Sequence, residues 1–150
     1  GGIPPSATAR PARRNLSFSS TCRSATLPLA YLLPAMQLLQ PMAGVITQGV
    51  RPEHPALDIA CAPGTPVRAA HDGSSSEQSS YTHGITVVLV GSDGLETRYS
   101  HLQQALAHGP VNRGDVIGLC GNTGIWSNGP HLHFEIRRGE TAHDPLVYLP

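Results

Sequence analysis

The sequence predicts an all-β domain: a compact antiparallel β-sheet, of a barrel or sandwich-like type, with few or no helices. Three observations favour this class. The 150 residues include 16 glycines and 14 prolines, a composition that is typical of many turns between short strands. Apolar residues recur in runs of five to seven that are bounded by Gly and Pro. Outside residues 29–39, no segment shows the periodicity of an amphipathic helix.

Residues 1–43 are predicted to be a disordered or loosely packed N-terminal tail or linker. Residues 1–26 are rich in Pro, Ala, Ser and Arg and show no periodicity, which favours disorder. The next stretch, "LPLAYLLPAMQLLQPMAG", is apolar, but three prolines and two glutamines interrupt it. These residues argue against a membrane-spanning helix and against membrane anchoring. A signal-peptide core, or a remnant of one, is the alternative interpretation.

Residues 44–150 are predicted to form the folded domain. A hairpin is expected over residues 84–102, "GITVVLVGSDGLETRYSHL", with a Ser-Asp-Gly turn and with Leu95, Thr97, Tyr99 and His101 on one face of the second strand. Residues 72–81, "DGSSSEQSSY", are polar and low in complexity, which predicts an exposed loop. Further strands are expected in "GVITQGV", "ALDIACAPGTPVRAAHDG", "VNRGDVIGLCGNTG" and "HLHFEIRRG", which a closing segment "DPLVYL" follows.

Charge and cysteine content exclude several classes of protein. Ten basic and ten acidic residues balance, so no broad positive field is available to hold nucleic acid. The three cysteines show no CxxC spacing, which excludes a zinc knuckle and a dense disulfide framework. One disulfide between Cys61 and Cys120 is left open by the sequence.

Histidines and one aspartate carry the chemistry of the chain. His131 and His133 are two residues apart in a predicted strand, so their side chains share a face. His54 and Asp58 are four apart and share a face in either an extended or a helical backbone. Imidazole and carboxylate are the ligands of catalytic Zn²⁺ sites, in which three protein ligands leave one position open. His101 adds a further imidazole at a strand end.

These five groups exceed the needs of metal ligation alone. If three of them bind a metal, two histidines remain to handle protons and developing negative charge during hydrolysis. The chain contains no HExxH motif, which excludes a thermolysin-like arrangement with a helical glutamate base.

Four segments together resemble the signature blocks of the lysostaphin and LytM type zinc endopeptidases. They are "HPALDIACAPGTPVRAAHDG", "LETRYSHL", "VNRGDVIGLCGNTG" and "NGPHLHFEIRRG", in the same order as in that family. The resemblance covers residues 44–150 and implies a LytM-type domain. It also implies one Zn²⁺ held by His54, Asp58 and His133, with His101 and His131 as the catalytic histidines.

The resemblance further implies a function. Members of the family hydrolyse peptide bonds of bacterial peptidoglycan, as DD-endopeptidases or cross-bridge endopeptidases, through a metal-activated water. The alternative is a catalytically inactive LytM-type domain that binds peptidoglycan or activates another cell-wall hydrolase. All five site positions carry the expected residue type, which favours the enzyme. The expected location is the bacterial envelope, periplasmic or secreted, or alternatively a phage virion or lysis system, and the expected state is a monomer.

Several residues outside the five receive other interpretations. Glu135 is expected on the same strand face as His131 and His133. It either hydrogen-bonds to a metal ligand from the outer side and orients it, or is a structural polar residue. Trp126 is interpreted either as a groove residue or as packing. The remaining histidines are interpreted as surface or structural residues: His71, His83, His108 and His143.

Overall fold

The computed structural model of the chain describes Gly2 and residues 37–150. The predictions for residues 1 and 3–36, a disordered tail or a signal-peptide core, lie outside the described residues.

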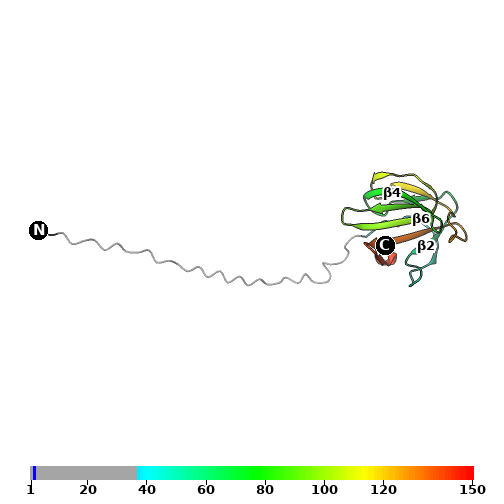
Figure 1. Cartoon of the computed structure of the whole chain (residues 1–150), viewed down its shortest axis with the longest axis horizontal. Helices are drawn as coiled ribbons and strands as arrows, with labels where there is room; N and C mark the ends of the chain where they lie inside the picture. The colour runs from blue at the N-terminus through cyan, green and yellow to red at the C-terminus, as the bar shows by residue number, and fades with distance from the viewer. Residues whose placement is uncertain (1, 3–36) are drawn as a thin grey trace. The chain divides into compact units, whose positions relative to one another are not determined.

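In the described part of the chain, ten strands form one antiparallel sheet, which confirms the predicted all-β class. Its main path runs β1-β2-β9-β6-β5-β4-β7, and Figure 1 shows the labelled strands β2, β6 and β4 across it. Off this path, β10 pairs with β9, and β8 pairs with β3 and β6. The strands are β1 Ile46–Gln48, β2 Leu57–Ala60, β3 Pro66–Arg68, β4 Gly73–Ser80, β5 Gly84–Val90, β6 Leu95–Ala105, β7 Gly109–Val111, β8 Val116–Cys120, β9 His131–Arg138 and β10 Thr141–His143. Among the described residues the helical structure is one short 3-10 turn, η2 Pro145–Val147.

The predicted hairpin is present as β5 and β6. Its strands pair antiparallel from Val90 opposite Glu96 onward, and Gly94 in the turn has a φ of 81°, a backbone conformation that glycine adopts without a steric penalty. Leu95, Thr97 and Tyr99 are buried on the core side of β6, as the alternation predicts.

The prediction of a loop over residues 72–81 was wrong, because this segment forms strand β4. Residues 74–80 lie opposite β5 throughout, and residues 73–75 also pair with β7. Only Ser75 of the strand is buried, so the expected exposure is present without the expected irregularity. The apolar strand β5 offers β4 a complete row of hydrogen-bonding groups, and this pairing outweighs the low β-propensity of a serine-rich segment.

The core lies between the inward faces of the strands and includes residues N-terminal to β1. Leu38 and Met42 are buried in the same cluster as Tyr99 and Phe134. The backbone also joins them to the sheet, since the amide of Leu38 donates to the carbonyl of Tyr148 at 2.8 Å. Close packing of the domain therefore extends at least to residue 38.

The disulfide that the sequence left open is formed between Cys61 and Cys120, whose Cα atoms are 6.5 Å apart. It connects the residue after β2 with the end of β8 and closes a sequence separation of 59 residues. A cross-link of this span stabilises a domain chiefly by restricting the unfolded chain.

A buried hydrogen-bond chain runs through the core from His71 to Tyr99. His71 Nε2 lies 3.0 Å from Thr97 Oγ1, and Thr97 Oγ1 lies 3.0 Å from the Tyr99 hydroxyl. That hydroxyl also accepts a hydrogen bond from the amide of Ala70 at 2.9 Å. Burial raises the pKa of Tyr99 to about 12, so the hydroxyl stays protonated.

We expect Tyr99→Phe to destabilise the domain by about 1–3 kcal/mol, because it leaves the buried amide of Ala70 without its acceptor. Urea unfolding followed by circular dichroism measures the change. Tyr81→Phe is the control: Tyr81 is exposed, so its free energy of unfolding should change by less than ~0.5 kcal/mol. Equal stabilities of the two variants would contradict the role of the hydroxyl.

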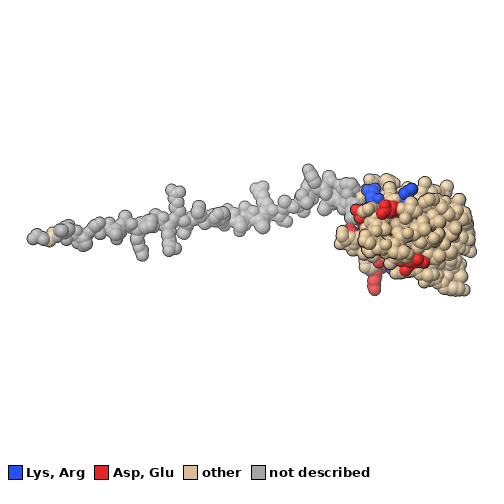
Figure 2. All heavy atoms as spheres, turned by 90° about the horizontal axis from the view of Figure 1, so that it is seen from above, with Lys and Arg blue, Asp and Glu red and all other residues tan. Residues whose placement is uncertain are grey.

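The charged side chains of the domain form no dominant patch on the face drawn in Figure 2, where acidic and basic groups are few and most atoms belong to other residues. Across Gly2 and residues 37–150, the structure has no helix of the length and hydrophobicity that crossing a membrane requires.

Candidate metal centre

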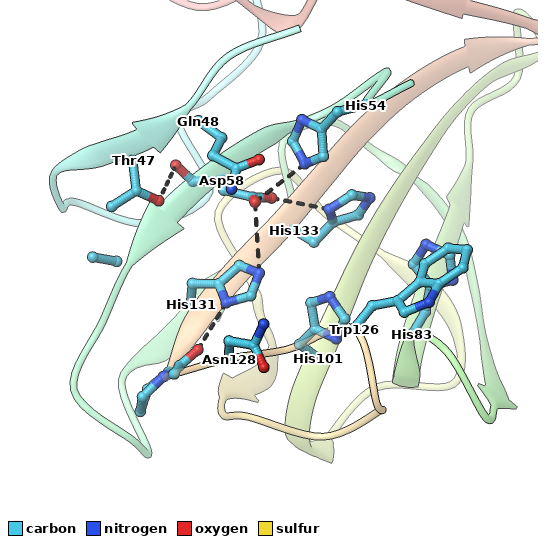
Figure 3. A pocket seen from close by; sticks show the side chains of 13 residues that line it. Thr47, Gln48, His54, Asp58, His83, His101, Trp126, Asn128, His131 and His133 are labelled. Carbon is cyan, nitrogen blue, oxygen red and sulfur yellow. Dashed lines mark hydrogen bonds and ion pairs between the residues drawn. The ribbon is translucent and has the colours of Figure 1, made fainter. Parts of the chain in front are cut away.

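The three predicted metal ligands converge at the β2–β9 ladder. Asp58 on β2 lies directly opposite His133 on β9, so the two side chains leave the same face of the sheet. His54 precedes β2 in a turn that reciprocal backbone hydrogen bonds with Arg51 close. Asp58 Oδ1 lies 2.9 Å from His133 Nδ1, and Asp58 Oδ2 lies 3.1 Å from His54 Nε2. Figure 3 shows both rings directed at the carboxylate.

The donor atoms of this cluster fit a metal ion. One atom from each of His54, Asp58 and His133 can be chosen so that all lie within 4.8 Å of one another. His54 Nε2 is buried and has no hydrogen-bond partner among the described residues. Its contact with Asp58 is close but lacks hydrogen-bond geometry, which is what two ligands of one ion would show. Two imidazoles and one carboxylate form the donor set of catalytic zinc sites.

Glu135 supports the ligand His133 from the opposite side. Glu135 Oε1 lies 3.2 Å from His133 Nε2, and Glu135 Oε2 accepts a hydrogen bond from Arg137 Nε at 2.7 Å. A proton on Nε2 that is donated to Glu135 leaves Nδ1 free to face the metal position. Glu135 therefore bonds the predicted ligand His133, which favours the first of the two roles that the sequence left open.

The electrostatics of the cluster follow from these contacts. Burial alone would lower the pKa of His133, but its hydrogen bonds to Asp58 and Glu135 raise that pKa to about 9. Burial would raise the pKa of Glu135, yet the bonds from His133 and Arg137 lower it to about 2. For Asp58, the hydrogen bond and charge of His133 outweigh burial and lower the pKa. At neutral pH the site thus holds two charged carboxylates around a protonated His133, and a bound cation would replace the proton on Nδ1 of His133.

We expect Glu135→Gln to weaken zinc binding by roughly 10–100-fold, the usual cost of losing an outer-shell partner. Glu135 offers one oxygen to His133 and the other to Arg137, whereas Gln has a single accepting oxygen and an amide nitrogen that only donates. Competition with a chromophoric chelator measures the affinity. Glu96→Gln is the matched control and should leave zinc affinity unchanged. Glu96 pairs with Arg98, and both lie on β6, the strand beside β9. A wild-type affinity in Glu135→Gln would contradict this assignment.

His101 reaches the site through an irregularity in β6. The sequence predicted it on the same face as Tyr99, and this was wrong. His101 has a φ of 61°, which reverses its side chain, and its ring lies 4.7 Å from that of His131 and 5.6 Å from that of His133. β6 leaves β9 after Ser100 and pairs with β8 from Leu102 onward, so the positive φ occurs where the strand changes partner.

The backbone fixes the orientation of both remaining histidines. His101 Nδ1 donates to the carbonyl of Thr123 at 2.6 Å, and His131 Nδ1 donates to the carbonyl of Gly129 at 2.8 Å. Each ring therefore keeps Nε2 for the site, and His131 Nε2 lies 3.7 Å from Asp58 Oδ2. Burial lowers the pKa of His101 to about 4, although the bond to Thr123 opposes this, so its ring is neutral at pH 7.

All five predicted residues line one cavity of about 400 Å³. Thr47 and Gln48 on the edge strand β1 form part of one wall, and residues 128–130 lead into β9. The cavity is open to solvent, and His54, Asp58 and His133 line it. A substrate can therefore reach the metal position.

His83 is a cavity residue that the sequence interpretation missed. It was interpreted as surface or structural, but its ring stacks on His101 at 5.9 Å and lies 5.2 Å from that of His133. Burial, followed by the charge of His133, lowers the pKa of His83. His83 belongs to the turn between β4 and β5, and a long-range bond from the amide of His101 to its carbonyl holds it there. No local pattern signals a contact of this kind.

Two imidazoles and a carboxylate that line an open cavity on an all-β sheet, flanked by two further histidines, form an arrangement that suits a metal-dependent hydrolase. Comparison with known proteins agrees. Residues 52–145 match Peptidase family M23, so the chain belongs to this metallopeptidase family.

Individual relatives agree with the family assignment. The chain is 41% identical over 100 residues to the DD-carboxypeptidase/endopeptidase Mpg of Neisseria meningitidis, covering 65% of this chain and 23% of the relative. It is 39% identical over 109 residues to the peptidoglycan DD-endopeptidase ShyA of Vibrio cholerae, covering 70% and 25%. The antimicrobial peptidase lysostaphin from Staphylococcus simulans shares the fold, with a TM-score of 0.61, 31% identity and coverage of 71% and 48%. The predicted resemblance to the lysostaphin type is confirmed. The chain spans about a quarter of the length of these curated relatives.

Proposed function

We propose that this chain is a zinc-dependent endopeptidase that hydrolyses peptide bonds of bacterial peptidoglycan. The observation that carries the proposal is the buried His54 Nε2, which lies beside Asp58 and His133 without a hydrogen-bond partner among the described residues. An unpaired buried imidazole nitrogen is costly unless an ion uses it. The peptidoglycan substrate rests on the name of the relative ShyA, and an envelope location follows from that substrate.

His54, Asp58 and His133 would hold the ion. A bound Zn²⁺ supplies Lewis acidity toward the scissile carbonyl and makes a water molecule available as a nucleophile near neutral pH. Glu135 keeps His133 in the tautomer whose Nδ1 faces the ion.

The other two histidines handle the proton and the negative charge. His101 is neutral at pH 7 and directs Nε2 into the cavity, so we assign it the role of general base that takes the proton of the attacking water. His131 also directs Nε2 into the cavity, where it would stabilise the negative oxygen of the tetrahedral intermediate. His101 then returns its proton to the leaving amine, which completes hydrolysis.

The alternative is a domain that binds peptidoglycan without cleaving it. All five chemical groups are present and converge on one cavity, whereas a binding function needs neither the ligand set nor the paired histidines. For this reason we favour the enzyme.

Digestion of defined muropeptides, with mass spectrometry of the products, tests the proposal. We expect two products whose masses together exceed that of the substrate by one water, and no products after treatment with a chelator. An intact substrate in the presence of fully zinc-loaded protein would overturn the proposal. Retained binding of that substrate would then favour the alternative.

A further inference from the structure

Trp126 is the sole tryptophan of the chain, and its indole stands at the edge of the site. The side chain is 63% exposed. Its ring packs edge-on against that of His83 at 5.1 Å, and His83 in turn stacks on His101. Figure 3 shows the indole beside His83, on the side of the site occupied by His101.

The loop that carries Trp126 is firmly attached to the turn between β4 and β5. The amide of Ile125 donates to the carbonyl of Tyr81 at 3.0 Å, and the amide of Trp126 donates to that of Thr82 at 3.1 Å. Gly124 lies so close to this turn that a Cβ atom added to it would be 2.4 Å from the backbone carbonyl oxygen of Thr82. The indole is therefore exposed but held in place, the combination that is typical of a binding anchor.

Trp126 contributes to two cavities rather than one. The first is the cavity above the metal centre. The second, of about 250 Å³, extends past Trp126 toward Glu53 and Arg137. Both cavities share His54, His83, Trp126 and His133, so an extended ligand that runs from one to the other passes the metal centre and the indole.

The distance between the indole and His101 limits which part of a substrate can contact the indole. Two ring contacts, of 5.1 and 5.9 Å, separate it from His101. An extended peptide advances roughly 3.3–3.6 Å per residue, so a peptide residue in contact with the indole lies within about three residues of the scissile bond. The indole face favours methylene groups, while Glu53 and Arg137 can receive a charged end of the side chain.

We propose that Trp126 is a specificity-determining residue whose indole binds the aliphatic side chain of a substrate residue within about three residues of the scissile bond. This inference rests on the proposed endopeptidase function and adds the kind of side chain that the enzyme prefers. The occupant is a peptide side chain rather than a sugar ring, because the indole lies so near the catalytic histidines.

Steady-state cleavage of two synthetic stem peptides tests the inference. The peptides carry no sugar and differ at one residue within about three positions of the scissile bond, which is either a diamino acid with a long methylene side chain or alanine. For the long side chain, we expect Trp126→Ala to raise KM about tenfold, equivalent to ~1.4 kcal/mol, with kcat unchanged. KM for the alanine peptide should change little, and Trp126→Phe should restore most of the difference.

Ile125→Ala is the matched control, because Ile125 is the exposed neighbour of Trp126 in the same loop and lines neither cavity. It should behave as wild type with both peptides. Equal KM values for wild type and Trp126→Ala would overturn the inference. A fall in kcat with KM unchanged would also overturn it, since Trp126 would then act by positioning His83.

Fluorescence separates this inference from the proposed function. Since Trp126 is the sole tryptophan, tryptophan emission reports on this indole alone. Titration of zinc-loaded His131→Ala protein with the sugar-free long-chain peptide should shift the emission to shorter wavelength. A shift that requires the disaccharide, or no shift at saturating peptide, would overturn the inference. If wild type cleaves neither peptide but the shift occurs, the proposed function fails and the binding site stands.

Discussion

His54→Ala will abolish stoichiometric zinc binding, and peptidoglycan cleavage will disappear with it. His54 supplies one of three ligand atoms, and its Nε2 has no other partner in the described part of the chain. The loss of zinc affinity should exceed the ~10–100-fold cost of removing an outer-shell partner, because a ligand itself is lost. Metal analysis of dialysed protein measures zinc per chain, and muropeptide digestion measures activity.

His108→Ala is the control for this experiment. His108 is exposed and lies 3.8 Å from Glu77, outside the cavity of the metal centre, so zinc content and activity should equal those of wild type. One zinc per chain in His54→Ala after dialysis would contradict the ligand assignment.

His131→Ala will retain one zinc per chain and lose turnover. His131 contacts Asp58 only at 3.7 Å, so its removal leaves the three ligands in place. Loss of a donor to the tetrahedral oxygen typically lowers kcat by about 10²–10³, and we expect a loss of this size with little change in KM. Parallel metal analysis and steady-state kinetics on a defined muropeptide provide both measurements.

His133→Ala is the informative comparison, since it lies two residues away on the same strand face. It should lose zinc as well as turnover, because His133 is a ligand that also bonds Asp58 and Glu135. Substitutions of these two histidines, which share one strand face, are thus expected to have different effects: His131→Ala loses turnover alone, and His133→Ala loses zinc and turnover. Wild-type turnover of His131→Ala, or equal loss of zinc from both variants, would contradict the division of roles.

Much of the site could be predicted because it depends on strand periodicity. His131 and His133 share a face of β9 through simple alternation. The turn that ends β5 was recognisable from its Ser-Asp-Gly sequence, and β6 begins directly after it. These features depend on the conformational preferences of residues that are close together in the sequence.

Three features could not be predicted in the same way. β4 is a strand because β5 and β7 pair with it, not because a serine-rich segment favours one. His101 enters the site through a positive φ at the point where β6 exchanges β9 for β8. His83 joins the cavity through a bond to the backbone of His101. Each of these depends on partners distant in sequence.

The all-β class, the five chemical groups and the placement of two of them on one strand face were predictable from the sequence. The face that His101 occupies, the bond between Glu135 and His133, and the positions of His83 and Trp126 beside the metal centre became apparent from the folded domain. Alternation is a property of a single strand, so it can be recognised without knowing the partners of that strand. Contacts across the sheet, and the backbone irregularities that they stabilise, exist only once the strands have paired.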